Sequence, residues 1–404
     1  MRALSKRSEE RSALTRRTLA QIANAREKSE WESRAGFRAR LAPATATTRN
    51  HSSKRGTQPA SIRMPAAKIN LARLPSAKSK FVEPMKALLV DQLPAGPDWL
   101  YEVKFDGVRA LAIKSKDAVS LISRAGNPLT GKYLQIAQAL RQLPAAAAVL
   151  DGELVALDPR GRSDFQLLQS YHSVGAKKPP LFYYVFDLIN LDGKDFTGLP
   201  LWQRKTMAEA AIAKLPRVIR FSASIQANSA PLVRAMQARG LEGLIAKRKE
   251  SKYESGRRSG AWVKFKWSNE QEFVIGGYTP PQGGRSYFGA ILVGYYQGNQ
   301  LLFAAKVGTG FNQKTLKELH GKFQSLLRSN CPFANLPENL PGSSKGLTAG
   351  KMRECTWLEP KLVCQIRFSE WTRDNHLRQP AFLGLREDKK PEEVVRERPD
   401  KSSK

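Results

Sequence analysis

The feature that most constrains this chain is a succession of short apolar runs separated by turn-forming residues, beginning near Phe81. Runs of this length are too short to span a bilayer and too regularly placed for a disordered chain. Strand-like runs occupy residues 99–103, 110–113, 119–122, 149–157, 181–189 and 244–246, and helical patterns occupy 133–142, 202–213 and 231–239, the last with Ser229 as its expected cap. Strands separated by turns, with helices interspersed, predict an α+β domain built on antiparallel sheets.

The pattern changes after Trp267. Short strand-like runs at 273–278, 290–296, 301–307 and 362–368 are punctuated by glycines, and they surround one helical stretch at 314–327. Several short strands with a single helix are typical of a small Greek-key β-barrel of the OB type. The sequence therefore predicts an α+β domain over residues 81–268, followed by an OB-fold β-barrel domain over residues 269–391.

Both ends of the chain are expected to lie outside these domains. Residues 1–80 contain 19 Lys and Arg against 5 Asp and Glu, a net charge of +14. Their first half has apolar residues at helical spacing around Leu19 and Ile22, and their second half, rich in Ser, Thr, Pro and Lys, predicts a disordered extension. Two interpretations stay open for this extension: an inert solubilising segment, or a flexible arm that adds salt-sensitive affinity for DNA. Residues 392–404 are charged and are expected to be frayed.

The charge balance indicates a polyanionic partner. The 404 residues include 67 Lys and Arg against 36 Asp and Glu, a net charge of +31. Such an excess favours nucleic acid, although a solubility function or a ribosome-associated protein would share it. The three cysteines form no C-x-x-C pair, so neither a disulfide framework nor a zinc cluster is indicated. No apolar run reaches membrane length and no secretory signal is recognisable, so we expect a cytoplasmic protein without membrane association.

A K-x-D-G sequence that begins at Lys104 is the first chemical motif. Lys104 follows a strand-like run and precedes a turn, so its side chain can project from the strand end into a cleft. We expect the positive charges of Arg109, Lys264 and Lys266 to disfavour the ammonium form of Lys104 and to free its amine for nucleophilic attack. Taken alone, the motif also fits a lysine on a surface hairpin.

Four further motifs lie between Ser123 and Lys247. Arg124 comes directly after a strand, where an arginine can hold a phosphate or a ribose. Glu153 and Glu242 lie within or beside apolar strands, where a carboxylate needs a cation or a hydrogen-bond partner. Residues 182–187 form an aromatic strand. Such rings usually belong to a core, but one of them could stack on a purine.

The run from Trp262 to Lys266 alternates apolar residues with lysines. Its period of two places Lys264 and Lys266 on one face of a strand. Two adjacent lysines repel each other unless an anion such as a phosphate lies between them. An exposed strand face is the other interpretation.

An Arg386-x-Asp388-Lys389 element completes the set. In this order the motifs resemble those of the covalent nucleotidyltransferases, which comprise DNA ligases, RNA ligases and mRNA capping enzymes. The likeness extends from Phe81 to Pro391 and is greatest to the ligase module of bacterial ligase D, the non-homologous end-joining enzyme, in residues 272–278, 307–311 and 377–389. The resemblance implies that residues 81–268 are a nucleotidyltransferase (adenylation) domain.

The resemblance also implies a role for each matching residue. Lys104 attacks the α-phosphate of ATP and becomes linked to AMP. Glu153 and Glu242 hold a divalent metal ion, Mg²⁺ or Mn²⁺, and Glu153 is also placed to bind ribose. The other nucleotide-binding residues are Glu102 near adenine, Phe186 stacked on it, Arg109 and Arg124 near ribose and phosphate, Arg258, Lys264 and Lys266 around the α-phosphate, Arg386 and Lys389 at the leaving pyrophosphate, and Lys247, which ends the Glu242 motif.

The implied function is an ATP-dependent DNA ligase that seals 5′-phosphate/3′-hydroxyl nicks in DNA repair or end joining. Expected partners are nicked or broken double-stranded DNA and a bacterial Ku-type end-binding protein, with the chain monomeric and associated with the nucleoid through DNA. The chain has no segment suited to the polymerase or phosphoesterase module of ligase D, which predicts a stand-alone ligase, and it lacks the four-cysteine zinc module of NAD-dependent ligases, which favours ATP. An RNA ligase, a capping-type nucleotidyltransferase and a non-catalytic DNA-binding module are the alternatives.

Overall fold

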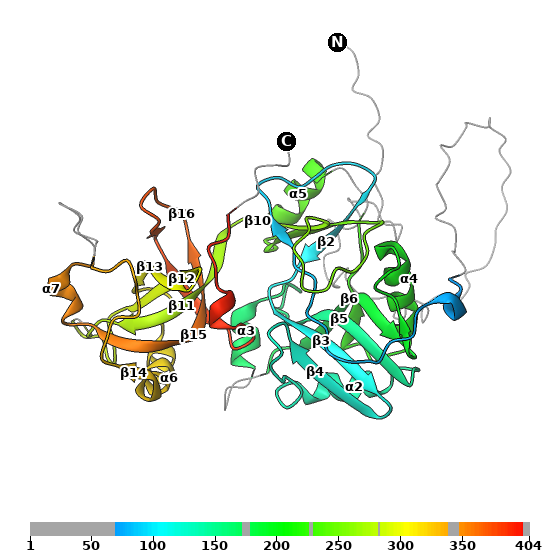
Figure 1. The fold of residues 1–404 in the computed structure, drawn as a ribbon, viewed down its shortest axis with the longest axis horizontal. Helices are drawn as coiled ribbons and strands as arrows, with labels where there is room; N and C mark the ends of the chain where they lie inside the picture. Colours follow the sequence, from blue (N-terminus) through cyan, green and yellow to red (C-terminus); the bar gives the residue numbers. More distant parts are fainter. Residues whose placement is uncertain (1–68, 172–177, 226–228, 282, 338–346, 399–404) are drawn as a thin grey trace, which may run out of the picture.

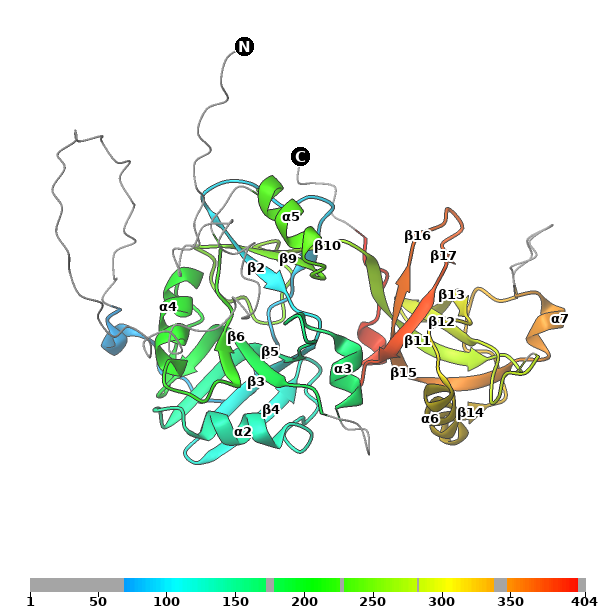
Figure 2. The same ribbon diagram turned by 180° about the vertical axis from the view of Figure 1, so that it is seen from behind.

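The computed structural model describes residues 69–171, 178–225, 229–281, 283–337 and 347–398. They form an N-terminal part, residues 69–267, and a C-terminal part, residues 268–398, which lie side by side in Figures 1 and 2. The helical pattern near Leu19 lies outside the described residues. No helix in the described ranges has both the length and the apolarity that crossing a membrane requires.

Two sheets make up the N-terminal part. The smaller has the strand order β1 (Leu88–Leu89), β10 (Trp262–Lys266), β9 (Gly243–Arg248) and β2 (Trp99–Lys104). The larger has the order β4 (Ala118–Ser123), β3 (Val108–Ser115), β5 (Ala147–Ala156), β6 (Leu181–Leu191) and β7 (Lys194–Asp195), and β8 (Ile219–Phe221) also pairs with β6. Neighbouring strands run antiparallel except in the pairs β1–β10 and β6–β8. The antiparallel α+β prediction is confirmed for this part.

Helices cover the outer faces of these sheets (Figure 1). Helices α2 (Leu134–Arg141) and α4 (Leu201–Ile212) pack against the larger sheet in one apolar core. Helix α5 (Ser229–Ala238) packs against the smaller sheet. A third cluster, which includes Leu100, Leu111 and Val149, fills part of the space between the two sheets. The short helix α3 (Phe165–Ser170) follows β5 and lies at the junction with the C-terminal part.

The C-terminal part is built on a sheet with the order β13 (Gln300–Val307), β12 (Ile291–Gln297), β11 (Asn269–Tyr278), β15 (Thr356–Phe368) and β14 (Leu327–Arg328), in which β18 (Ala381–Leu385) also pairs with β15. Its remaining elements are α6 (Gln313–Phe323), η3 (Gln324–Leu326), α7 (Ala349–Met352), the hairpin β16 (Glu370–Trp371) with β17 (Leu377–Arg378), and η4 (Pro391–Glu393). From Phe81 onward, every strand-like run and helical pattern of the sequence overlaps an observed element.

The C-terminal part has the strands expected of an OB-type barrel, but they do not close into a barrel. Among the described residues, the end of β13 meets the start of β18 around Thr309. The contacts there are an isolated bridge to Ala381, a hydrogen bond from the Phe382 N–H to the Thr309 carbonyl, and one from the Thr309 hydroxyl to the Pro380 carbonyl. Closure is interrupted because the chain turns at Gly310, whose φ is +91° and whose Cα lies too close to Phe382 for a Cβ. The fold is thus an OB-type sheet with an open seam.

The ends of the chain are more ordered than expected within the described ranges. Residues 69–80 include the 3₁₀ turn η2 (Leu71–Arg73), and Leu74 packs against the larger core. At the other end, Val394 is buried and hydrogen-bonds through its carbonyl to the Tyr296 N–H. Both segments are held because each supplies an apolar side chain to a core and backbone groups to a strand. A smaller difference concerns Ser229, which is the first residue of α5 rather than its cap.

Candidate active site

Alternation along β2 directs the K-x-D-G lysine into the space between the two sheets. Tyr101 and Val103 pack on the α5 side of the smaller sheet, whereas Leu100 packs toward the larger sheet. Successive side chains of a strand point to opposite faces, so Glu102 and Lys104 share the face of Leu100. The same period places Lys264 and Lys266 of β10 on the face of Trp262, which also belongs to the intersheet cluster.

A single pocket gathers every site residue predicted from the sequence. It lies between the two sheets and is bounded on one side by the C-terminal part. Its lining includes Glu102, Lys104, Arg109, Arg124, Glu153, Phe186, Glu242, Lys247, Arg258, Lys264, Lys266, Arg386 and Lys389. These residues come from positions nearly three hundred residues apart, so their meeting in one pocket is a property of the fold rather than of local sequence.

Lys104 lines this pocket and forms an ion pair with Glu242. The register of β2 and β9 brings them together, because Lys104 is paired with Gly243, the neighbour of Glu242. Position 243 needs glycine, since a Cβ there would overlap the carbonyl oxygen of Phe265 in β10. The second carboxylate oxygen of Glu242, Oε2, is buried without a hydrogen-bond partner in the described part of the chain.

The expectation that nearby cations lower the pKa of Lys104 is wrong. Burial acts to lower that pKa, but the charge of Glu242 and its hydrogen bond outweigh burial, and the pKa of Lys104 is raised. The three cations expected to act on Lys104 are engaged elsewhere: Arg109 with Asp151, Lys264 with Glu397, and Lys266 with the Glu270 carbonyl. In this arrangement Lys104 is a protonated ammonium held by its counter-ion.

Two further carboxyls near Lys104 are perturbed. Burial raises the pKa of Glu153 to about 7. Burial together with the charge of Glu242 raises the pKa of Asp106 to about 7. A buried carboxyl with a raised pKa gains stability from a bound cation, which favours its ionised form.

These carboxylates fit a hard divalent ion only in part. Mg²⁺ is commonly held by one or two carboxylates together with water and substrate phosphates. Glu242 Oε2 is an unpartnered buried oxygen, and the side-chain carboxylate of Glu153 makes no hydrogen bond or ion pair with any described residue. The described residues contain no group of three or more His, Cys, Asp or Glu that could hold a metal without other ligands. The donor set therefore fits an ion that shares its coordination sphere with a phosphate.

Glu102 lies deeper in the pocket and is fully engaged by protein groups. Its carboxylate pairs with Lys205 at 2.9 Å and Lys247 at 3.1 Å, and it accepts hydrogen bonds from the hydroxyls of Ser222 and Ser224 at 3.1 and 3.4 Å. Burial opposes ionisation, but the two lysines hold the pKa of Glu102 below its usual value. The carboxylate thus fixes the neighbouring lysines.

Those lysines border the one aromatic ring assigned to the nucleotide. The ammonium of Lys247 lies 4.3 Å from the centroid of the Phe186 ring, and burial lowers the pKa of Lys247 to about 8. The Phe186 ring also packs edge-on against Trp262 at 6.2 Å. Phe186 is therefore held in place while it lines the pocket.

Arg109 is held by a bidentate ion pair. Its Nε and Nη2 donate to Asp151 at 3.0 and 2.6 Å, and its Nη1 donates to the Met85 carbonyl at 2.6 Å. The hydroxyl of Tyr253 donates to the same carboxylate at 2.7 Å. Asp151 has no exposed surface, so this pair fixes the guanidinium at the pocket wall.

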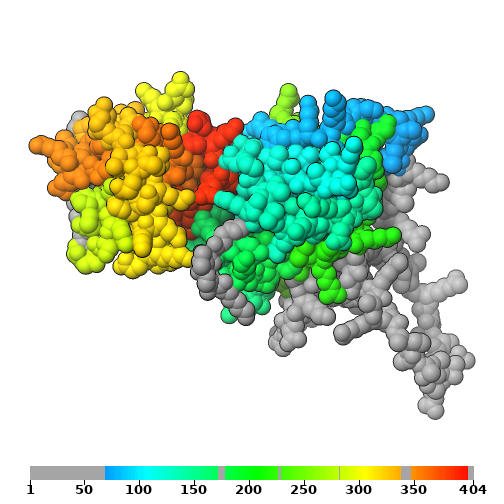
Figure 3. All heavy atoms as spheres, turned by 90° about the horizontal axis from the view of Figure 1, so that it is seen from below, coloured from blue at the N-terminus to red at the C-terminus, as the bar shows by residue number. Residues whose placement is uncertain are grey.

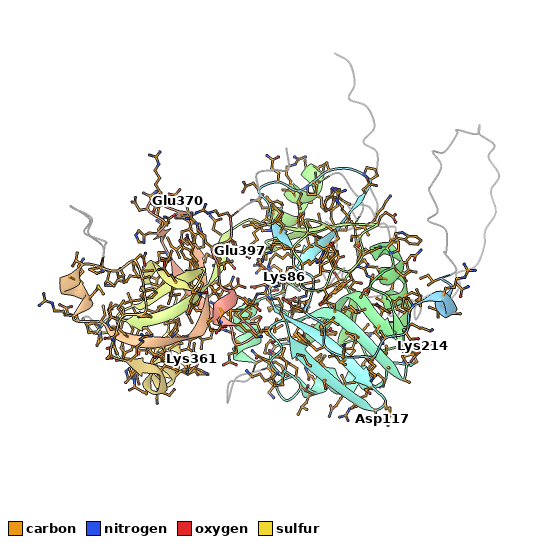
Figure 4. The ribbon with its side chains drawn as sticks, in the orientation of Figure 1. Lys86, Asp117, Lys214, Lys361, Glu370 and Glu397 are labelled. Atoms are coloured by element: carbon orange, nitrogen blue, oxygen red, sulfur yellow. The ribbon has the colours of Figure 1, made fainter. Side chains whose placement is uncertain are left out.

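The C-terminal part contributes the remaining wall. Arg386 forms a bidentate pair with Asp388 at 2.9 and 2.8 Å, and Lys389 pairs with Glu272 at 2.8 Å. Glu397 reaches back to Lys264 at 2.6 Å. Figure 3 shows the carboxy-terminal segment, coloured red, between the two parts, and Figure 4 labels Glu397 at the junction.

The residues missed from the sequence are mostly counter-ions of the predicted ones. They are Asp106, Asp151, Lys205, Ser222, Tyr253, Glu272 and Glu397. Asp151 carried a usable signal, because a carboxylate within an apolar run must have a partner. Glu397 carried none, since it lies in a short charged segment beyond the last motif.

Comparison with known proteins gives matches over both parts. The family model described as "ATP dependent DNA ligase domain" matches residues 80–266, and that described as "ATP dependent DNA ligase C terminal region" matches residues 284–389. A multifunctional non-homologous end joining protein LigD from Pseudomonas aeruginosa is 37% identical over 324 residues, which are 79% of this chain. The corresponding DNA repair protein of Mycobacterium tuberculosis is 36% identical over 304 residues, 74% of this chain. The chain spans 37% of the length of each of these two relatives.

A solved structure is similar over most of the described residues. It is a mycobacterial DNA ligase D complexed with ATP and MES, with a TM-score of 0.55 and 33% sequence identity. The match covers 78% of this chain and 98% of that one.

Proposed function

This chain belongs to the family of ATP-dependent DNA ligases, and on that premise we propose that it seals 5′-phosphate/3′-hydroxyl nicks in DNA through a lysyl-AMP intermediate at Lys104. The observation that carries the proposal is the meeting of Lys104, two carboxylates and the Arg386–Lys389 element in one pocket. A ligase of this family uses ATP and a divalent metal ion, here Mg²⁺ or Mn²⁺. When held by Glu153 and Glu242, that ion supplies charge neutralisation at the α-phosphate.

In the first step, the Lys104 amine attacks the α-phosphorus of ATP, the bond to the bridging oxygen breaks, and pyrophosphate leaves. Lys104 must first give up its proton and its pairing with Glu242, which holds the ammonium form in this structure. Lys264 and Lys266 neutralise the α-phosphate, and Arg386 and Lys389 orient the departing pyrophosphate. Phe186 and the Glu102–Lys247 pair bound the adenine end, and Arg109, Arg124 and Arg258 border the ribose and phosphates.

In the second and third steps, AMP passes to the 5′-phosphate of the DNA, and the adjacent 3′-hydroxyl then displaces it. The Arg386–Lys389 element lines the same pocket as Lys104 and thus closes it where the C-terminal part meets the adenylation domain. We therefore propose that the C-terminal part, assigned as the OB-fold domain over 269–391, moves away from the adenylation domain, 81–268, between steps. Residues 267–271, which run from the end of β10 into the first residues of β11, are the expected hinge, although β11 already pairs with β15 from Asn269.

Several wider assignments follow from the relatives by analogy. We infer a function in DNA repair and end joining, because the multifunctional relatives are named for non-homologous end joining. A Ku-type end-binding protein is the proposed partner, with a cytoplasmic, nucleoid-associated monomer as the working form. The basic residues of the N-terminal extension, residues 1–80, are proposed as a DNA-binding arm, with an inert solubilising segment as the competing proposal.

The proposed function is tested by incubating the protein with nicked duplex DNA, ATP and Mg²⁺ or Mn²⁺. We expect ATP-dependent sealing, with a labelled protein band from α-labelled ATP and none from α-labelled GTP. Labelling by GTP alone would favour a capping-type enzyme, and sealing of nicked RNA but not DNA would favour an RNA ligase. Absence of labelling with either nucleotide, in folded protein free of bound AMP, would contradict the proposal.

The two phosphate-facing lysines predict an alkaline limit to the first step. Burial lowers the pKa of Lys264 to about 8, and burial together with Arg124 lowers the pKa of Lys389 to about 8. Both ammonium groups are charged below this pH and lose their protons above it. The fraction of Lys104 present as free amine rises with pH, but two phosphate-binding charges are lost over the same range. We therefore expect kcat/KM for ATP in the adenylation step, which reports on the free enzyme, to fall as the pH rises through about 8.

Arginine stays protonated over this pH range, so replacing the lysines by arginine tests whether their deprotonation causes the alkaline fall. The Lys264→Arg/Lys389→Arg double variant is expected to lose the alkaline fall relative to its own maximum, and each single variant should keep part of it. A fall that is identical in wild type and double variant would assign it to another group.

A further inference from the structure

Helix α3 (Phe165–Ser170) contacts two segments that line the pocket: the K-x-D-G turn after Lys104 and the strand that leads into the Arg386–Lys389 element. Asp164 caps it, accepting from the N–H groups of Gln166 and Leu167 at 2.8 and 3.1 Å. Figures 1 and 2 both show α3 at the junction of the two parts, beside the end of β15 and the carboxy-terminal segment. The ligase motifs do not include any residue of this helix.

One end of α3 is attached to the nucleophile loop. The N–H of Phe165 donates to Asp106 Oδ2 at 3.1 Å, and Asp106 lies two residues after Lys104. The N–H of Asp106 in turn donates to the hydroxyl of Ser163 at 2.9 Å. These two bonds connect the K-x-D-G turn to both sides of the helix start.

The other face of α3 receives the strand that leads into the Arg386–Lys389 element. Gln169 Nε2 donates to the carbonyl of Leu385 at 2.6 Å. A Cβ at Gly384 would overlap the side-chain amide of Gln169, so β18 approaches the helix as closely as glycine permits. The guanidinium of Arg386 lies 4.6 Å from the centroid of the Phe165 ring. Arg386 is thus stacked on the residue whose backbone holds Asp106.

A second contact fixes the next residue of the element. Asn127 Nδ2 donates to the carbonyl of Glu387 at 2.8 Å, and the Glu387 carboxylate is shared by Lys132 of the N-terminal part and Lys322 of the C-terminal part. Gln169, Lys132 and Lys322 are exposed. Contacts of this kind are individually weak and exchange readily with water, as a reversible domain contact requires.

We propose that Gln169 and Phe165 of α3, together with Asn127, are positioning residues for the adenylation step. They hold the Leu385–Glu387 backbone so that Arg386 and Lys389 face the pyrophosphate end of ATP while Asp106 holds the turn of the nucleophile. The inference rests on the proposed function, in which Arg386 and Lys389 act only in the adenylation step, where they orient the leaving pyrophosphate. Sealing of DNA that is already adenylated requires neither pyrophosphate release nor these contacts.

The test uses variants that exchange a hydrogen-bond donor for an acceptor without changing side-chain size. Gln169→Glu and Asn127→Asp each place a carboxylate oxygen against a backbone carbonyl. Gln142→Glu is the matched control, because Gln142 is also an exposed glutamine at a helix end in the N-terminal part and its side chain makes no contact recorded in the described residues. Two rates are measured for each full-length protein: single-turnover formation of lysyl-AMP from ATP, and ATP-independent sealing of a pre-adenylated nick.

Both variants are expected to slow lysyl-AMP formation about tenfold while sealing of the pre-adenylated nick and the melting temperature stay close to wild type. The control should leave both rates unchanged. Equal losses in the two reactions would mean that α3 has only a general structural effect, and an unchanged adenylation rate would overturn the positioning role. Failure of the wild type itself to form lysyl-AMP would instead refute the proposed function, so the two failures are distinguishable.

Discussion

Lys104→Ala is expected to abolish formation of the covalent enzyme–AMP adduct, lowering its rate by more than about a thousandfold, as loss of a catalytic nucleophile does. Lys104 is the lysine that points between the two sheets and pairs with Glu242. Without its amine no other described group occupies the same position. The measurement is transfer of radioactivity from α-labelled ATP to the protein, resolved by denaturing electrophoresis.

Lys252→Ala is the control, since Lys252 is an exposed lysine of the same part of the chain and does not line the pocket. It should label as wild type does. Lys104→Ala should still seal a pre-adenylated nick to a measurable extent, because displacement of AMP by the 3′-hydroxyl does not use the lysine as a nucleophile. Undiminished labelling of the Lys104 variant would show that AMP is linked to a residue other than Lys104.

Arg204→Ala is expected to lower the free energy of unfolding by about 3–5 kcal/mol, the cost of leaving one member of a buried ion pair without its partner. Arg204 and Asp187 both have fully buried side chains, and two parallel bonds of 2.8 Å join them. The remaining nitrogen of Arg204 donates to the carbonyls of Leu199 and Ser251 at 2.6 and 2.9 Å. Alanine removes these bonds and leaves the Asp187 carboxylate uncompensated.

Urea denaturation followed by tryptophan fluorescence measures this loss as a lower transition midpoint. The matched control is Arg162→Ala, whose ion pair with Asp158 at 2.8 Å involves an arginine side chain that is 39% exposed. Screening by solvent limits that loss to about 1 kcal/mol or less. Equal losses in the two variants would contradict the assignment of Arg204 as a structural anchor.

The sequence predicted the fold where periodicity is strong. Alternation in residues 262–266 indicated that Lys264 and Lys266 share a face, and the place of Lys104 at a strand end indicated that it projects into a cleft; all three line one pocket. Short strands such as β7 and β8 escaped prediction because two or three residues contain no measurable period. The open seam of the second sheet also escaped it, since closure depends on how Gly310 turns the chain against β18.

The sequence was least informative about electrostatics. It identified the cations of the site but not their partners, which are distant along the chain: Lys205 lies 103 residues after Glu102, and Glu397 lies 133 residues after Lys264. The pKa of Lys104 was therefore assigned the wrong direction, because the dominant neighbour is the carboxylate of Glu242 rather than the surrounding cations. Pairings of this kind depend on strand order and register, which local patterns do not encode.

Residues 394–397 place a carboxylate of the protein itself, that of Glu397, on a lysine of the pocket, so an incoming anion must displace this carboxylate before it can bind there. Glu397 is attached to the protein, so its carboxylate competes for Lys264 at an effective concentration of about millimolar or more. A free monovalent anion below that concentration does not displace it, whereas a triphosphate, which contacts several cations at once, gains enough to do so. We therefore expect the resident counter-ion to favour a multidentate ligand and to keep Lys264 clear of the small anions that a chain with a net charge of +31 attracts.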